Sequence, residues 1–151
     1  MNRASAPTGR RTTVLITGAA GNLGGLLARQ MLPAGYPLRL MFHKTPLAPD
    51  IASAANVVAV QADLADEATL PAAVKGADVV VHFAGVLFAP RPARFLPETN
   101  TRWFGNLLDA CVQARVDRVV LISFPHVEGP TTVEHPARGR SDGRPVSVHA
   151  Q

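Results

Sequence analysis

Residues 12–31 pass from a strand-like run through a glycine-rich loop into a helix-like pattern. The run TTVLIT (12–17) is β-branched and continuously apolar, as expected of a strand buried on both faces of a parallel sheet. The loop GAAGNLGG follows at once, and apolar residues from Leu23 to Met31 then recur at helical spacing. Because parallel strands need a crossover between them, this order predicts an α/β fold.

The same alternation continues along the chain and predicts about five strands in a Rossmann-like, doubly wound parallel sheet. Further strands are expected at 37–42, 56–64, 78–85 and 117–124, and helices from Asn22, at 66–76 and at 98–116. Asn22 is the expected N-cap of the first helix and Asp66 that of the second.

The pattern also divides the chain. Residues 1–11 are small, polar and basic and are expected to be a disordered leader. Residues 12–124 hold the alternating strands and helices and form the expected Rossmann-like domain. Residues 125–151 carry prolines and glycines but few apolar residues, so we expect an extended loop or tail that leads to a missing substrate region. The sheet is therefore expected to be incomplete on its C-terminal side.

Composition excludes several classes of function. With 47% hydrophobic and 17% charged residues the chain is that of a globular protein. The net charge of +4 comes mainly from three arginines within 1–11; the rest holds 12 basic and 11 acidic residues, which argues against nucleic-acid binding. No apolar run is long enough to span a membrane. The single cysteine, Cys111, offers no disulfide or metal site, lies on an apolar helical stripe as a core residue, and suits a cytoplasmic protein.

Three glycines in the first loop have the spacing of a phosphate-binding turn. Gly18 would make the tight turn, Gly21 would let the backbone approach a pyrophosphate, and Gly24 would let helix and strand pack closely. A triphosphate-binding P-loop is excluded because no Gly-Lys-Ser/Thr follows. Small residues in such a turn can also serve packing alone, so the loop by itself leaves the function open.

Four motifs together carry a family resemblance. TGAAGNLG (17–24) resembles the TGxxGxxG loop of the extended short-chain dehydrogenase/reductase superfamily, the NAD(P)-dependent epimerase/dehydratase group. ADL (62–64) is similar to that family's acid-leucine pair after the third strand, and HFAG (82–85) to its HxAG turn. The segment from Asn100 into the long helix and RVVLISF (118–124) resemble the helix and strand that follow. The match runs in order from Thr12 to about Gly129.

The resemblance implies a set of cofactor-binding residues. Asp63 and Leu64 would meet the adenine, and Ala84 and Gly85 would line the ribose. Gly18, Gly21 and Gly24 would hold the pyrophosphate. The other expected cofactor-binding residues of this loop are Ala20, Asn22 and Leu23. Other interpretations stay open for single residues: Asp63 can cap the next turn, His82 can be a hydrogen-bonded core histidine, and Asn100 can cap its helix.

The end of the second strand bears on the choice of cofactor. NAD-dependent folds place an acid there for the ribose 2′-hydroxyl, whereas a basic residue accommodates a 2′-phosphate. Here the run MFHKTP carries His43 and Lys44 and no acid, which favours NADP(H) over NAD(H). The missing acid also argues against a methyltransferase.

The catalytic pattern of the family is incomplete in this chain. Its strand-end serine pair falls on Ser123 and Phe124, so one hydroxyl is absent. The catalytic tyrosine position falls on His149, and the lysine four residues later lies beyond the last residue. The only tyrosine, Tyr36, is expected to pack at the far end of the first helix. Ser123 and His149 are the only candidate catalytic residues.

The resemblance implies an oxidoreductase or isomerase that acts on a hydroxyl or carbonyl of an unidentified small-molecule substrate, and a homodimer in the full-length form. We favour a truncated chain over a genuinely short one, because a sheet that ends after its fifth strand leaves an edge uncovered. The alternatives are a catalytically inactive dinucleotide sensor and a remnant that binds nothing.

Overall fold

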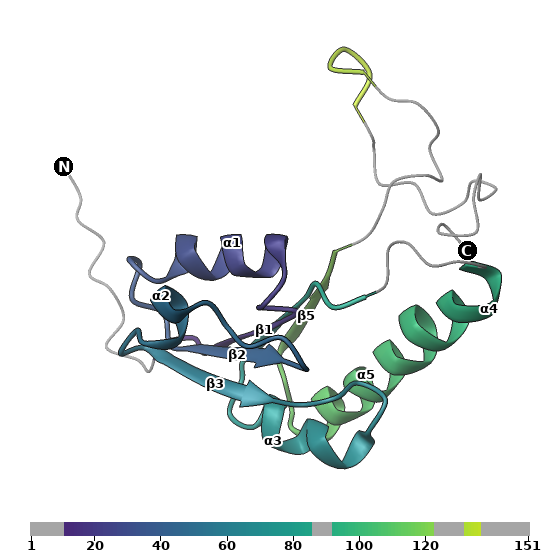
Figure 1. The fold of residues 1–151 in the computed structure, drawn as a ribbon, viewed down its shortest axis with the longest axis horizontal. Helices are drawn as coiled ribbons and strands as arrows, with labels where there is room; N and C mark the ends of the chain where they lie inside the picture. The colour runs from purple at the N-terminus through teal and green to yellow at the C-terminus, as the bar shows by residue number, and fades with distance from the viewer. Residues whose placement is uncertain (1–10, 86–91, 123–131, 137–151) are drawn as a thin grey trace.

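The computed structural model describes residues 11–85, 92–122 and 132–136, and within them one parallel sheet forms the centre of the molecule (Figure 1). Its five strands lie in the order β3-β2-β1-β4-β5. Their bounds are Val14–Thr17 (β1), Leu38–Phe42 (β2), Val57–Gln61 (β3), Val79–His82 (β4) and Arg118–Leu121 (β5). The predicted Rossmann-like α/β fold is confirmed.

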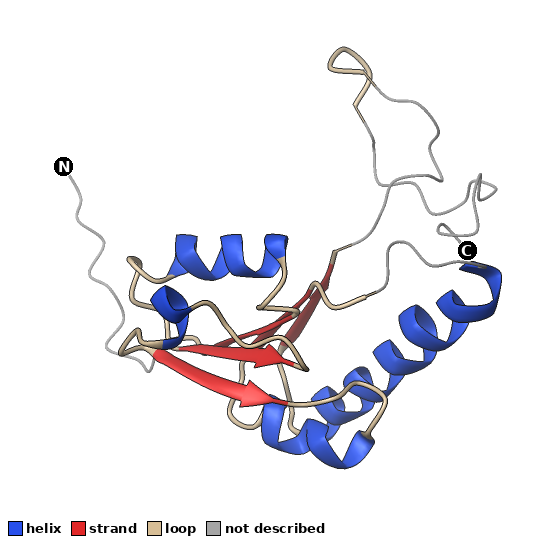
Figure 2. Cartoon of the chain, viewed as in Figure 1, coloured by secondary structure: helices blue, strands red, loops and turns tan. Residues whose placement is uncertain are grey.

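Helices cover both faces of the sheet (Figure 2). The helices α1 and α2 lie over one face, and α3 with the long segment from α4 to α5 lies over the other. The helical bounds are Asn22–Met31 (α1), Pro49–Ala52 (α2), Glu67–Thr69 (the 3₁₀ turn η1), Leu70–Val74 (α3), Pro92–Leu96 (α4), Pro97–Arg102 (the π-helical η2) and Trp103–Gln113 (α5).

The strand order places a switch point at the centre of the sheet. β1 pairs with β2 on one side and with β4 on the other, so the chain winds outward in both directions from β1. Thr17, the last residue of β1, is in register with Met41 and His82. In such folds ligands bind outside the carboxyl ends of the strands at this point. The fold itself therefore marks where a site should be.

The core consists of two apolar clusters, one on each face of the sheet. All four residues of β1 are buried, as its continuous apolar run predicted. Leu15 belongs to the cluster under α3 and α5, and Ile16 to the cluster under α1 and α2. Cys111 is buried in the first cluster, and burial raises the pKa of its thiol to about 11. This agrees with a structural rather than a reactive cysteine.

Several elements differ from the sequence-based expectation. The long helical segment begins at Pro92 rather than at residue 98, because α4 and η2 run without a break into α5. A short helix, α2, lies between β2 and β3, where none of the expected helices falls. Arg11, assigned to the leader, donates hydrogen bonds to the carbonyls of Ala34 and Gly35, at 3.1 and 2.9 Å. Ser123, His149 and most of the tail lie outside the described residues.

No helix within the described ranges has both the length and the apolar character needed to cross a membrane.

Candidate functional site

The loop after β1 makes its tight turn at Gly18. This residue has a φ of +67°, in the left-handed region that glycine adopts without strain. A Cβ atom there would lie 2.8 Å from the backbone nitrogen of Ala84. The absence of a side chain at Gly18 thus allows the loops after β1 and β4 to touch.

Gly24 brings α1 against the same loop. A Cβ atom at Gly24 would lie 2.3 Å from the carbonyl oxygen of Gly18 and 3.0 Å from the Cα atom of Ala19. Both neighbours are backbone atoms that cannot move aside on their own. The first turn of α1 therefore packs directly onto the end of β1, as the glycine spacing predicted.

The start of α1 differs from the prediction in its cap. Gly21, not Asn22, is the N-cap, because Gly21 has extended dihedral angles and Asn22 is already helical. The carbonyl of Gly21 accepts the first helical hydrogen bond, from the nitrogen of Gly25 at 2.8 Å. No side chain caps the amide groups of this turn. Such uncapped amides at the positive end of the helix dipole favour an anion.

A cleft of about 380 Å³ opens at the carboxyl ends of β1, β2, β3 and β4. It is lined by Gly18, Ala20, Gly21, Met41, Phe42, His43, Lys44, Thr45, Ala62, Asp63, Leu64, Ala84, Gly85, Thr99 and Trp103. The structure thus brings together most of the residues predicted to bind cofactor. The exceptions are Asn22, Leu23 and Gly24, which do not line the cleft.

One side of the cleft is formed by residues that the sequence did not predict as cofactor-binding. Thr99 and Trp103 lie four residues apart in η2 and at the start of α5, which places them on one side of the helical segment. The resemblance singled out Asn100 instead, and this residue is exposed. Asn100 does not cap a helix, because the segment is already helical from Pro92. The helical spacing of Thr99 and Trp103 was the only signal available.

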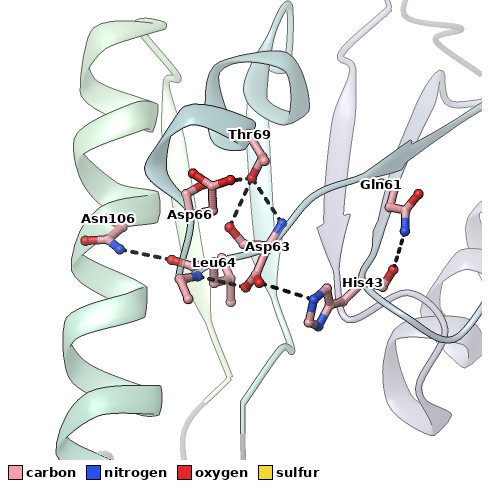
Figure 3. Close-up of polar contacts among 8 residues, drawn as sticks. His43, Gln61, Asp63, Leu64, Asp66, Thr69 and Asn106 are labelled. Atoms are coloured by element: carbon pink, nitrogen blue, oxygen red, sulfur yellow. Dashed lines mark hydrogen bonds and ion pairs between the residues drawn. The ribbon is translucent and has the colours of Figure 1, made fainter.

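Asp63 caps the next turn, as one of its interpretations held, and its side chain also lines the cleft (Figure 3). One carboxylate oxygen, Oδ1, accepts a hydrogen bond from the nitrogen of Ala65 at 2.9 Å, which caps the turn after β3. The other oxygen, Oδ2, lies 3.2 Å from Nε2 of His43, and both side chains line the cleft. The next residue, Leu64, is tied to α5 because its carbonyl accepts from Nδ2 of Asn106 at 3.0 Å.

His82 is a core histidine, as one of its interpretations held. The residue is 4% exposed, and the centroid of its ring lies 4.8 Å from that of Phe104. Nδ1 of His82 forms a 2.8 Å hydrogen bond with the hydroxyl of Thr17, which also accepts from the nitrogen of Ala84 at 3.3 Å. Through this contact the ends of β1 and β4 hold Ala84 at the edge of the cleft.

The burial of His82 makes the stability of the domain depend on pH. Desolvation lowers the pKa of His82 from 6.5 to about 4. Between pH 6.5 and about 4, His82 is therefore protonated in the unfolded chain but neutral in the native chain. As the pH falls across this range, the free energy of unfolding decreases by about 3 kcal/mol. Urea unfolding across this range should show the loss in the native chain and a flatter profile in His82→Gln; equal profiles would contradict the assignment.

Comparison with known families gives an independent result. The model of a family described as NAD(P)H-binding matches residues 18–146, which is most of the chain. The chain belongs to this NAD(P)H-binding family. The resemblance to short-chain dehydrogenases and epimerases is confirmed.

The relatives of this chain include dehydrogenases. The chain is 32% identical over 148 residues to the human 3 beta-hydroxysteroid dehydrogenase type 7, covering 93% of the chain and 40% of the relative. It is 38% identical over 116 residues to the uronate dehydrogenase of Pseudomonas putida, covering 77% of the chain and 42% of the relative. The chain thus spans about two fifths of the length of these relatives.

Solved structures show the same fold. A uronate dehydrogenase from Agrobacterium tumefaciens, solved with NAD, has a TM-score of 0.65 and 32% identity, over 78% of this chain and 43% of the other. The enzyme WbmG from Bordetella bronchiseptica, also solved with NAD, has a TM-score of 0.75 and 25% identity, over 97% of this chain and 48% of the other.

Proposed function

We propose that this chain holds a nicotinamide dinucleotide in the cleft at the carboxyl ends of its strands, as the cofactor half of a hydride-transfer oxidoreductase or isomerase. The observation that carries the proposal is the loop from Gly18 to Gly24. Its first and last glycines bring β4 and α1 onto the loop, and Gly21 leaves the start of α1 uncapped at the cleft. A diphosphate can then accept from main-chain amides directly.

The other cofactor contacts follow from the lining of the cleft. Ala84 carries only a methyl group and Gly85 has no side chain, which leaves room for a ribose to pack beside β4. Asp63 presents a carboxylate to which an adenine amino group could donate. The bound nicotinamide would supply or accept the hydride. The residues of this chain would bind and orient the dinucleotide and exclude water from it.

Within the proposal we favour NADP(H). His43 and Lys44 follow β2 and line the cleft, and no acidic residue accompanies them in that loop. Asp63 is the one carboxylate among the described residues that line the cleft, and it lies beside His43. Solved relatives hold NAD, so this preference rests on the charges of this chain alone.

For the reaction we propose a type, hydride transfer, and no particular substrate. Several of its relatives are dehydrogenases, which supports hydride transfer to or from a hydroxyl or carbonyl of a small molecule. The candidate catalytic residues Ser123 and His149 lie outside the described residues and stay predictions. No observation favours the alternative of an inactive sensor.

The proposal can be tested with the chain's own tryptophan. Trp103 is the single tryptophan of the sequence and lines the cleft, so its fluorescence should change as NADPH or NADH binds. Both cofactors should also raise the melting temperature, as expected of a ligand that binds only the native state. We expect the lower dissociation constant for NADPH. No fluorescence change and no stabilisation at millimolar cofactor would refute the proposal.

A further inference from the structure

Two strand ends are joined across the cleft by the side chains of His43 and Asp63. His43 follows β2 and Asp63 lies two residues after β3, and the neighbouring residues Phe42 and Gln61 are in register. Nε2 of His43 lies 3.2 Å from Oδ2 of Asp63. The carbonyl of His43 also accepts a hydrogen bond from Nε2 of Gln61 at 3.0 Å (Figure 3). Both the backbone and the ring of His43 are therefore held.

This arrangement distinguishes the two ring nitrogens of His43. An ionised carboxylate can only accept, and Oδ1 of Asp63 already accepts from Ala65. The contact with Oδ2 therefore favours the forms of His43 that carry a proton on Nε2. Nδ1 is then a bare acceptor when the imidazole is neutral and an N–H donor when it is protonated.

We propose that His43, oriented by Asp63, determines which form of the dinucleotide is bound, and that its protonation changes the preference. The neutral ring can accept from the ribose 2′-hydroxyl of NAD(H). The protonated ring can donate to the 2′-phosphate of NADP(H) in a charge-assisted hydrogen bond. This inference rests on the proposed function, and it replaces a fixed preference with one that changes with pH.

The other charged groups at this end of the cleft support the assignment. Among the described lining residues, those with titratable side chains are His43, Lys44 and Asp63. Asp66 is nearby in sequence, but its carboxylate accepts from the nitrogen of Ala68 within its own turn. Lys44 attracts a phosphate whether or not His43 is charged. Histidine is the side chain whose charge ordinarily changes between pH 5 and 8, so a change of preference in that range points to His43.

The experiment compares NADP⁺ with NAD⁺ at two pH values on the 151-residue chain. Trp103 fluorescence gives both dissociation constants at about pH 8.5 and about pH 6.5, a window in which the 2′-phosphate stays mainly dianionic. We expect the preference for NADP⁺ to rise about five-fold toward the lower pH. Protonation of the phosphate itself would act in the opposite direction, so it cannot produce this result.

Variants separate the contribution of each group. His43→Gln should abolish the rise, and His43→Lys should give a high NADP⁺ preference at both pH values. Asp63→Asn removes the carboxylate that orients the ring, so the rise should weaken. Asp50→Asn is the matched control, because it breaks another exposed ion pair, with Arg29 at 2.7 Å, that does not line the cleft. It should respond like the native chain.

Two failures can be told apart. If both dinucleotides bind but their ratio is independent of pH, or rises equally in His43→Gln, this inference is overturned and the proposed function stands. If neither dinucleotide binds at any pH, both the proposed function and this inference are refuted.

Discussion

Replacing Gly24 with alanine should destabilise the domain by about 3 kcal/mol, at the upper end of what overpacking one methyl group costs. The new Cβ atom would lie 2.3 Å from the carbonyl oxygen and 2.8 Å from the carbonyl carbon of Gly18, both fixed in the turn after β1. Relief requires α1 to move away from the sheet as a whole. Denaturant unfolding of the variant measures the loss.

Gly105→Ala provides the matched control for this prediction. Gly105 is also inside a helix, α5, and a Cβ atom there would meet nothing within 4 Å. Alanine should stabilise that helix by about 0.5–1 kcal/mol, because it is the better helix former. If Gly24→Ala proved as stable as Gly105→Ala, the close contact between α1 and the glycine turn would be wrong.

Replacing Gly21 with leucine should weaken dinucleotide binding about 100-fold while leaving the fold intact. Gly21 has φ −84° and ψ 171°, which any residue adopts, and its nearest neighbour to a new Cβ atom is the carbonyl of Gly18 at 3.2 Å. The backbone can therefore accept the change with a small shift. The added side chain would stand at the uncapped start of α1, where the diphosphate is proposed to lie.

Two measurements check the Gly21 variant: cofactor titration by Trp103 fluorescence and the free energy of unfolding without cofactor. We expect the first to change strongly and the second by less than about 1 kcal/mol. Gly21→Ala, with only the Cβ atom added, should lose much less affinity than Gly21→Leu. Binding to the leucine variant as tight as to the native chain would refute the proposed place of the pyrophosphate.

The glycine spacing of this loop predicted its turn and its close packing but not the N-cap of α1. The sequence predicted three roles for Gly18, Gly21 and Gly24 from their spacing, and the turn and the close packing are both present. The cap was assigned one residue late, to Asn22, because asparagine is a common N-cap whereas glycine at Gly21 gives no side-chain signal.

The amino-acid sequence by itself determined the class of fold and the edge of the sheet at which the cleft opens. Strand and helix periodicity are local properties, and the carboxyl ends of parallel strands necessarily share one edge of the sheet. This is why Ala84, Gly85 and Asp63, each just after a strand, were placed correctly at one cleft.

Only the tertiary structure decided which distant side chains meet there. Thr99 and Trp103 reach the cleft because the helical segment begins as early as Pro92 and passes over the strand ends. His43 meets Asp63, twenty positions later, because β2 and β3 pair in one particular register. Such contacts depend on long-range packing, and nothing in the residues adjacent to either partner specifies them.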